Sequence, residues 1–170
     1  MTKSTSASKK DFIPGEVVVY PSHGVGTVTK IETQRIADQE VKLFVISFEQ
    51  ERMVLRVPLH KAAASGLRKL STQTAMEAAF ETLQQPKGQL RGIWNRRATE
   101  YNAKIKTGNP VSLAEVVRDL YRAPGQPEAS YSARLLYEQA LGRLSHEVAA
   151  VERTELQAAT GKVEQLLNAA

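Results

Sequence analysis

The period of the hydrophobic pattern changes at Pro58, and this change constrains the fold of the 170-residue chain more than any other feature. Between Phe12 and Pro58, short β-branched runs alternate between apolar and polar residues, as antiparallel strands do. After Pro58, apolar residues recur at helical spacing. The sequence therefore predicts an α+β fold, in which a small, bent, antiparallel β-sheet is followed by a C-terminal α-helical bundle.

Four or five short strands are expected before Pro58. Prolines and turn-forming residues place them at residues 16–20, 24–32, 42–49 and 52–58, with a turn over 37–40. The alternation puts Val25, Thr27, Thr29 and Ile31 on one face of the second strand, and Phe44, Ile46 and Phe48 on one face of the third. A sheet of this size buries little apolar surface, so we expect it to pack against another surface.

Serines mark the expected starts of three helices. Ser71, Ser112 and Ser132 are interpreted as N-caps of helices over 72–83, from 112 to about 121, and over 132–152. A basic helix is expected after Gly88, ending at residues 107–110, and a last amphipathic helix over 155–167. We interpret residues 1–11 as a disordered tail, 12–64 as a β domain and 65–170 as a helical domain.

Positive charge is concentrated between Lys87 and Lys106. This stretch holds six cations and one anion, Glu100, for a local net charge of +5 that equals the formal net charge of the whole chain. Trp94, the single tryptophan, lies inside it, just before an Arg-Arg pair. Cations neutralise phosphates, and an aromatic ring stacks on bases or wedges between them, so the stretch suits nucleic acid. The alternative is a core tryptophan covered by the stems of the arginines, and the stretch alone does not decide between them.

Composition argues against several other functions. The chain has no cysteine, which excludes disulfides and thiolate metal sites and fits a reducing compartment. No apolar run approaches the ~18 residues that span a bilayer, and the N-terminus lacks a signal-peptide core. The three histidines lie far apart in no metal-binding pattern, and no phosphate loop is present. We therefore expect a cytoplasmic protein that is not an enzyme, with no cofactor, no metal and no membrane contact.

Two sets of motifs resemble the CarD family of bacterial transcription regulators. The β half carries PGEVVVYPSHGVG at residues 14–26 and VLRVP at 54–58, and the helical half carries WNRR at 94–97 and AEVVRDLY at 114–121. The motifs keep the family's order, and the resemblance covers about residues 12–167. The chain is most similar to the short, stand-alone CdnL-type members. Its β half, Tudor-like in this family, also resembles the polymerase-interacting domain of transcription-repair coupling factor.

The resemblance implies a role at promoters. It implies that the β module binds the β subunit of RNA polymerase, while the helical domain contacts promoter DNA near the upstream edge of the melted bubble. Trp94 would wedge into the minor groove, and Arg96 and Arg97 would hold phosphates with little sequence specificity. Many relatives have an aromatic residue and a lysine directly after the arginine pair, where this chain has Ala98 and Thr99. This departure implies that one phosphate contact is either lost or supplied by Lys104 or Arg91, which complete the set of expected DNA-binding residues.

The fourth expected strand is the predicted polymerase-binding element. Arg56 would make a charged contact, and Met53 and Val54 would be apolar residues exposed on an edge strand that invites a partner strand. The alternative for each single residue is ordinary core, because one face of this strand must be buried.

These observations lead to one leading function and one alternative. The leading hypothesis is a non-catalytic, monomeric, global transcription regulator that binds polymerase and promoter DNA, associates with the nucleoid through polymerase, and stabilises the open complex. The alternative is a protein-only scaffold, with a Tudor-like interaction module and a structural helical bundle whose basic face contacts acidic protein.

Overall fold

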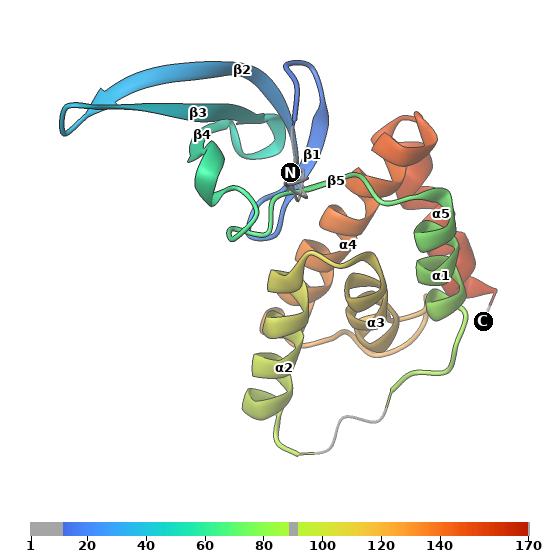
Figure 1. Ribbon diagram of the computed structural model, residues 1–170. Helices are drawn as coiled ribbons and strands as arrows, with labels where there is room; N and C mark the ends of the chain where they lie inside the picture. Colours follow the sequence, from blue (N-terminus) through green and yellow to red (C-terminus); the bar gives the residue numbers. More distant parts are fainter. Residues whose placement is uncertain (1–11, 89–91, 170) are drawn as a thin grey trace, which may run out of the picture. The chain divides into compact units, whose positions relative to one another are not determined.

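The computed structural model describes residues 12–88 and 92–169, and the chain divides into two compact units between Lys69 and Leu70. The first unit holds a five-stranded antiparallel sheet, and the second holds five α-helices (Figure 1). Each unit has a hydrophobic core of its own. The predicted α+β fold is confirmed, whereas the tail expected over residues 1–11 lies outside the described residues. Within the described ranges, no helix is both long and apolar enough to cross a membrane.

The sheet has the strand order β4-β3-β2-β1-β5. Its strands are β1 Val17–Tyr20, β2 Gly24–Ile36, β3 Gln39–Phe48, β4 Met53–Pro58 and β5 Arg68–Lys69. The prediction missed β5, because a two-residue strand carries no readable alternation. The fourth expected strand is found as β4, at one edge of the sheet. Its outer backbone groups are therefore placed to pair with a partner.

A tight hairpin joins the two longest strands. Ala37 and Asp38 form its turn with φ values of 50° and 61°, as two-residue hairpins of the primed type require. The turn is two residues shorter than the expected turn over 37–40, because Gln39 and Glu40 already belong to β3. Because β1 pairs with residues 24–27 and β4 with 43–48, residues 30–42 of the described chain form a two-stranded arm, the β2–β3 arm (Figure 1).

The two predicted strand faces have different outcomes. Phe44, Ile46 and Phe48 are all buried in the core of the β unit, as expected. The face predicted for β2 is wrong at Ile31, because a bulge between Val28 and Lys30 shifts the register and places Ile31 opposite Phe44. Val28 and Gly26 occupy the buried face instead. A Cβ atom on Gly26 would lie 2.7 Å from the Phe48 ring, so the sheet needs a glycine there.

The helical unit is built around α3. Its helices are α1 Gln73–Leu83, α2 Trp94–Thr107, α3 Pro110–Leu120, α4 Tyr131–Glu152 and α5 Leu156–Asn168. α3 packs against α1, α2 and α4 (Figure 1). Its residues Leu113, Val116 and Val117 are at most 1% exposed. Together with Leu120 they form the apolar stripe of α3, and their spacing of three and four residues is typical of a buried helix face.

All three predicted N-caps are wrong. The capping side chains are those of Thr72, Asn109 and Ser130. Thr72 lies one residue after Ser71, whereas Asn109 and Ser130 lie three and two residues before Ser112 and Ser132. Several residues in each segment are able to cap a helix. Asn109 also precedes Pro110, which is well suited to the first helical position. The displaced Ser71 donates from its backbone N and its Oγ to buried Glu147, at 3.0 and 2.6 Å.

Candidate functional site

Trp94 is the first residue of α2, so the helix starts later than the predicted basic helix. The half-buried indole packs against the core of the helical unit, with its ring centroid 6.4 Å from that of Tyr101. The Arg97 guanidinium lies 5.5 Å from the ring centroid, and the indole Nε1 donates to Ser132 Oγ at 2.8 Å. Trp94 is therefore held in one orientation and keeps part of its side chain in solvent.

Ile93 extends the apolar surface beyond Trp94, and the sequence prediction missed it. This residue is the N-cap of α2, it is 73% exposed, and it makes no capping side-chain hydrogen bond. An isoleucine is among the poorest N-caps. Ile93 and Trp94 together form an apolar tip at the start of α2, which we call the Ile93–Trp94 tip.

Ile93→Ser is expected to stabilise the helical unit by about 0.5–1 kcal/mol, because serine supplies the cap that isoleucine lacks. Urea unfolding of the two proteins measures the difference. Ile93→Ala is the matched control, because it removes the same apolar surface without adding a cap. If the serine variant is no more stable than the alanine variant, the N-terminus of α2 is satisfied in another way.

The two arginines that follow the tip have different environments. Arg97 is half-buried and hydrogen-bonds the hydroxyl of buried Tyr101. Burial raises the pKa of Tyr101, and the bond from Arg97 opposes that rise. The buried Nε of Arg97 has no hydrogen-bond partner within the described ranges. Arg96 is exposed, so Arg97 supports the indole while Arg96 faces solvent.

Lys104 is not brought together with Trp94. It lies ten positions further along α2, about 15 Å at 1.5 Å per residue. Its Nζ is 2.6 Å from Glu115 Oε2 on α3. Thr99, which stands where many relatives have a lysine, is uncharged, and its hydroxyl donates to the Asn95 carbonyl at 3.0 Å. Arg91, the other residue expected to replace that contact, lies outside the described residues.

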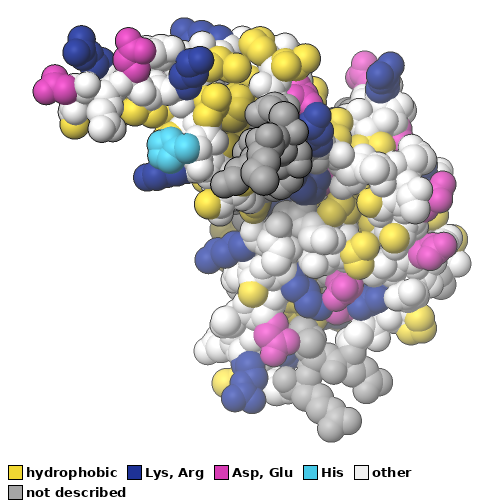
Figure 2. All heavy atoms as spheres, in the orientation of Figure 1, with side chains coloured by type: hydrophobic (Ala, Val, Ile, Leu, Met, Phe, Trp, Pro, Cys, Tyr) yellow, Lys and Arg dark blue, Asp and Glu magenta, His cyan; other side chains and the backbone are white. Residues whose placement is uncertain are grey.

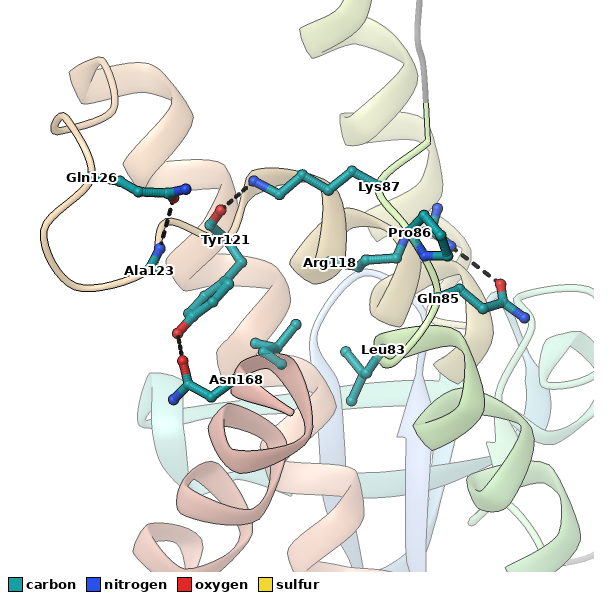
Figure 3. A pocket seen from close by; sticks show the side chains of 10 residues that line it. Leu83, Gln85, Pro86, Lys87, Arg118, Tyr121, Ala123, Gln126 and Asn168 are labelled. Carbon is teal, nitrogen blue, oxygen red and sulfur yellow. Dashed lines mark hydrogen bonds between the residues drawn. The ribbon is translucent and has the colours of Figure 1, made fainter. Parts of the chain in front are cut away.

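The segment before α2 is fastened to the end of α3. In this strap, residues 84–88, the Gly88 backbone N donates to Asp119 Oδ1 at 2.8 Å. The Lys87 Nζ donates to the Tyr121 carbonyl at 2.6 Å, at the rim of a cavity of about 290 Å³ (Figure 3). A Cβ on Gly88 would lie 3.1 Å from the Asp119 carboxylate, so the close approach favours glycine. The strap fixes Lys87 relative to α3.

The cations of the helical unit do not form one continuous surface. On the face shown in Figure 2, Lys and Arg side chains over the helices are separated by Asp and Glu side chains. Of the six cations in the 87–106 stretch, Lys87, Arg97 and Lys104 contact groups of the protein itself, and Arg96 and Lys106 are exposed. The predicted cluster is therefore divided between the two ends of α2.

On β4, the three residues predicted to bind polymerase lie on two faces of the sheet. Val54 is 52% exposed, and Arg56, two residues along, is exposed on the same face. Met53 pairs with Phe48 across the sheet and packs half-buried against the core of the β unit. The prediction of an exposed Met53 is wrong, because alternation along the strand turns it inward with Leu55.

Arg56 forms an ion pair across the open face of the sheet. Its Nε lies 2.9 Å from Glu32 Oε2, and Lys30 lies 3.9 Å from the other oxygen of the same carboxylate. The hydrogen bond from Arg56 is the main reason that the pKa of Glu32 is below its usual value of 4.5. Burial of the carboxylate opposes this effect.

The Arg56–Glu32 pair predicts a pH dependence with a definite sign. Because the folded-state pKa of Glu32 is lowered, its contribution to stability is present above pH 4.5 and is lost as the pH falls through the folded value. We expect Arg56→Gln to be less stable than the parent protein near neutral pH, and this difference to shrink below pH 4.5. Urea unfolding across that range measures it. A difference that is constant with pH would show that Arg56 acts through something other than Glu32.

Both units match known protein-family models. A family model described as "CarD, C-terminal domain" matches residues 78–164, and one described as "CarD-like/TRCF RID domain" matches residues 12–71. Among curated proteins, "Putative transcription factor YdeB" of Bacillus subtilis (strain 168) is 27% identical over 141 residues. That alignment covers 83% of this chain and 92% of YdeB. The two family matches follow each other in the order of the two units.

Proposed function

Because the chain belongs to the CarD family, we propose that it is a non-catalytic regulator of transcription initiation that binds RNA polymerase and promoter DNA in the same complex. The family is one of transcription factors, so the chain acts in the regulation of transcription. Its β unit matches the RID type, which is an RNA polymerase-interacting domain. In this proposal the protein acts as a monomer and stabilises the open complex.

The polymerase contact is assigned to β4 and to the β subunit of the enzyme. β4 is an edge strand, and on its open face it carries the exposed Val54 and the charged Arg56. An edge strand offers backbone pairing, and alternate side chains give specificity. Met53 supports this surface from the core side, without touching the partner.

The Ile93–Trp94 tip is the observation that carries the DNA half of the proposal. A partly exposed indole, fixed by Ser132 and Arg97, stands at the start of a helix whose next cation, Arg96, is exposed. Apolar wedges of this kind enter the minor groove and unstack a base step, while neighbouring cations hold phosphates. At the upstream edge of a melted bubble the step is already weakened, so a wedge there slows closure of the bubble.

A gel shift with polymerase and forked promoter DNA tests the proposal. The protein is expected to join the polymerase–DNA complex and to lengthen the lifetime of the open complex. If it neither joins the complex nor changes that lifetime, the scaffold function is favoured instead, with the basic helix contacting acidic protein.

The protein alone is expected to bind duplex DNA weakly and with little sequence preference. Six phosphate contacts would give a salt slope of roughly −5. Lys104 is already paired with Glu115, so we expect a shallower slope. Fluorescence anisotropy with a labelled duplex at several salt concentrations measures it. Tight, site-specific binding without polymerase would contradict the proposal.

A further inference from the structure

A second cavity, of about 440 Å³, lies directly beside the tip. It is bounded by the strap, the start of α2, the end of α3, the segment after α3 and the start of α4. The residues that matter for its chemistry are Lys87, Trp94, Arg97, Asp119, Arg122 and Ser130. Arg122 and Ser130 belong to no motif that the sequence prediction used.

The cavity has an excess of positive charge. Three of its lining residues are cations, and the single carboxylate among them, Asp119, is already engaged. Asp119 Oδ1 accepts from the Gly88 backbone N at 2.8 Å and from Arg118 Nε at 2.9 Å, and its side chain is only 3% exposed. Asp119 therefore holds the strap in place. Its single negative charge is shared between Arg118 and Lys87, so it does not balance the three cations of the cavity.

Arg122 lies close enough to Lys87 to affect the pKa of its ammonium group. Burial lowers the pKa of Lys87, and the positive charge of Arg122 lowers it further, whereas Asp119 raises it. The hydrogen bond from the Lys87 ammonium to the Tyr121 carbonyl keeps the Lys87 side chain near Arg122. An anion beside Lys87 and Arg122 would relieve their repulsion.

The remaining walls also favour an anion. Ser130 caps α4, a 22-residue helix, whose N-terminus carries partial positive charge. Arg97 lines the cavity with a buried Nε that has no hydrogen-bond partner in the part of the chain that the structure describes. Trp94, held by Ser132, adds a flat aromatic wall next to these donors.

We propose that this cavity is a phosphate-binding pocket, in which Arg122 and Lys87 hold a phosphate group next to the Trp94 ring. A phosphate beside an aromatic wall is the chemistry of a nucleotide unit. Its source is either the DNA backbone at the step that the tip contacts, which rests on the proposed function, or a free nucleotide polyphosphate.

The test uses Trp94 as its own reporter, because it is the only tryptophan in the chain. Tryptophan emission is recorded while the full-length protein is titrated with inorganic pyrophosphate and, separately, with a short duplex. Arg122→Gln removes the pocket cation. Arg153→Gln is the matched control, because it removes the same charge from an exposed residue at the opposite end of α4. Thermal melting verifies that both variants are folded.

Arg122→Gln is expected to lower the affinity of the protein for pyrophosphate, for the duplex or for both by about tenfold or more. The reason is that a hydrogen bond to a charged group is worth about 1.5–3 kcal/mol. Arg153→Gln is expected to leave that affinity unchanged. If the source is DNA, the salt slope for the duplex also becomes shallower by about 0.9 in Arg122→Gln alone. If it is a free nucleotide, only the pyrophosphate titration responds.

The outcomes separate this pocket from the proposed function. In one outcome, the protein binds pyrophosphate in a way that depends on Arg122 and yet does not bind duplex DNA. That result would support the phosphate pocket and contradict the proposed DNA contact. Duplex binding with equal affinity and slope in the two variants, together with no Arg122-dependent pyrophosphate response, rejects the pocket and keeps the DNA contact.

Discussion

Arg56→Glu is expected to abolish retention of the protein on the RNA polymerase β subunit in a pull-down, while both units stay folded. The substitution reverses a charge on the exposed face of the edge strand β4. Like charges placed opposite each other at an interface cost several kcal/mol, enough to remove a contact of ordinary strength. DNA affinity should not change, because Arg56 and the tip belong to different units.

Glu32 makes a sharper control possible. Arg56→Glu alone also places two carboxylates side by side, so it would perturb the sheet as well as the partner. The double variant Glu32→Arg, Arg56→Glu restores an ion pair between β2 and β4 with its direction reversed. If Arg56 contacts polymerase, the double variant stays inactive; if the intramolecular pair is what matters, binding returns. Unchanged retention of the single variant would show that another strand or the other face binds polymerase.

Trp94→Ala is expected to shorten the lifetime of the open complex by about tenfold or more, because unstacking a base step costs a few kcal/mol that the wedge offsets. The same change should destabilise the helical unit by about 2 kcal/mol, below the ~3–5 kcal/mol of a fully buried aromatic residue. That cost follows from the half-buried ring, its contact with Tyr101 and its bond to Ser132. Polymerase binding should survive.

Two further variants distinguish the orientation of the indole by Ser132 from the insertion of the ring between bases. Ser132→Ala removes the hydrogen bond to the indole and leaves the ring in place, so it should shorten the open-complex lifetime less than Trp94→Ala does. Trp94→Phe keeps an apolar ring without the Nε1 donor and should fall between the two. A Trp94→Ala protein that melts much earlier, yet supports open complexes normally where it is folded, would show that Trp94 is only a core residue.

The sequence predicted the elements better than their ends. Strand alternation in Phe44, Ile46 and Phe48 and the apolar stripe of α3 come from burial, which leaves a periodic signal. Helix starts depend on one side chain among several able to cap, which explains the errors at Ser71, Ser112 and Ser132. The bulge after Val28 and the two residues of β5 are set by pairing between distant segments, and no local pattern records them.

At the candidate site, the sequence drew attention to Trp94 as a candidate but did not predict its surroundings. Trp94 became the candidate because it is the single tryptophan and lies among cations. Its partner Ser132 was assigned to a cap, and Ile93 was overlooked because the helix was expected to start several residues earlier. The pairing of Lys104 with Glu115 and the closeness of Lys87 to Arg122 arise from packing of segments far apart in the chain, so spacing along the sequence could not reveal them.

The β2–β3 arm bears on how the protein behaves in concentrated solution. Over residues 30–42 the described strands pair only with each other, so both outer edges carry open backbone groups that are able to template aggregation. Ile31 and Ile36 are 41% and 51% exposed on the arm. Charged residues of both signs separate them from further apolar surface: Lys30, Glu32, Arg35, Glu40 and Lys42. These charges act as gatekeepers against edge-to-edge association, so neutralising them would convert the arm into a site of self-assembly.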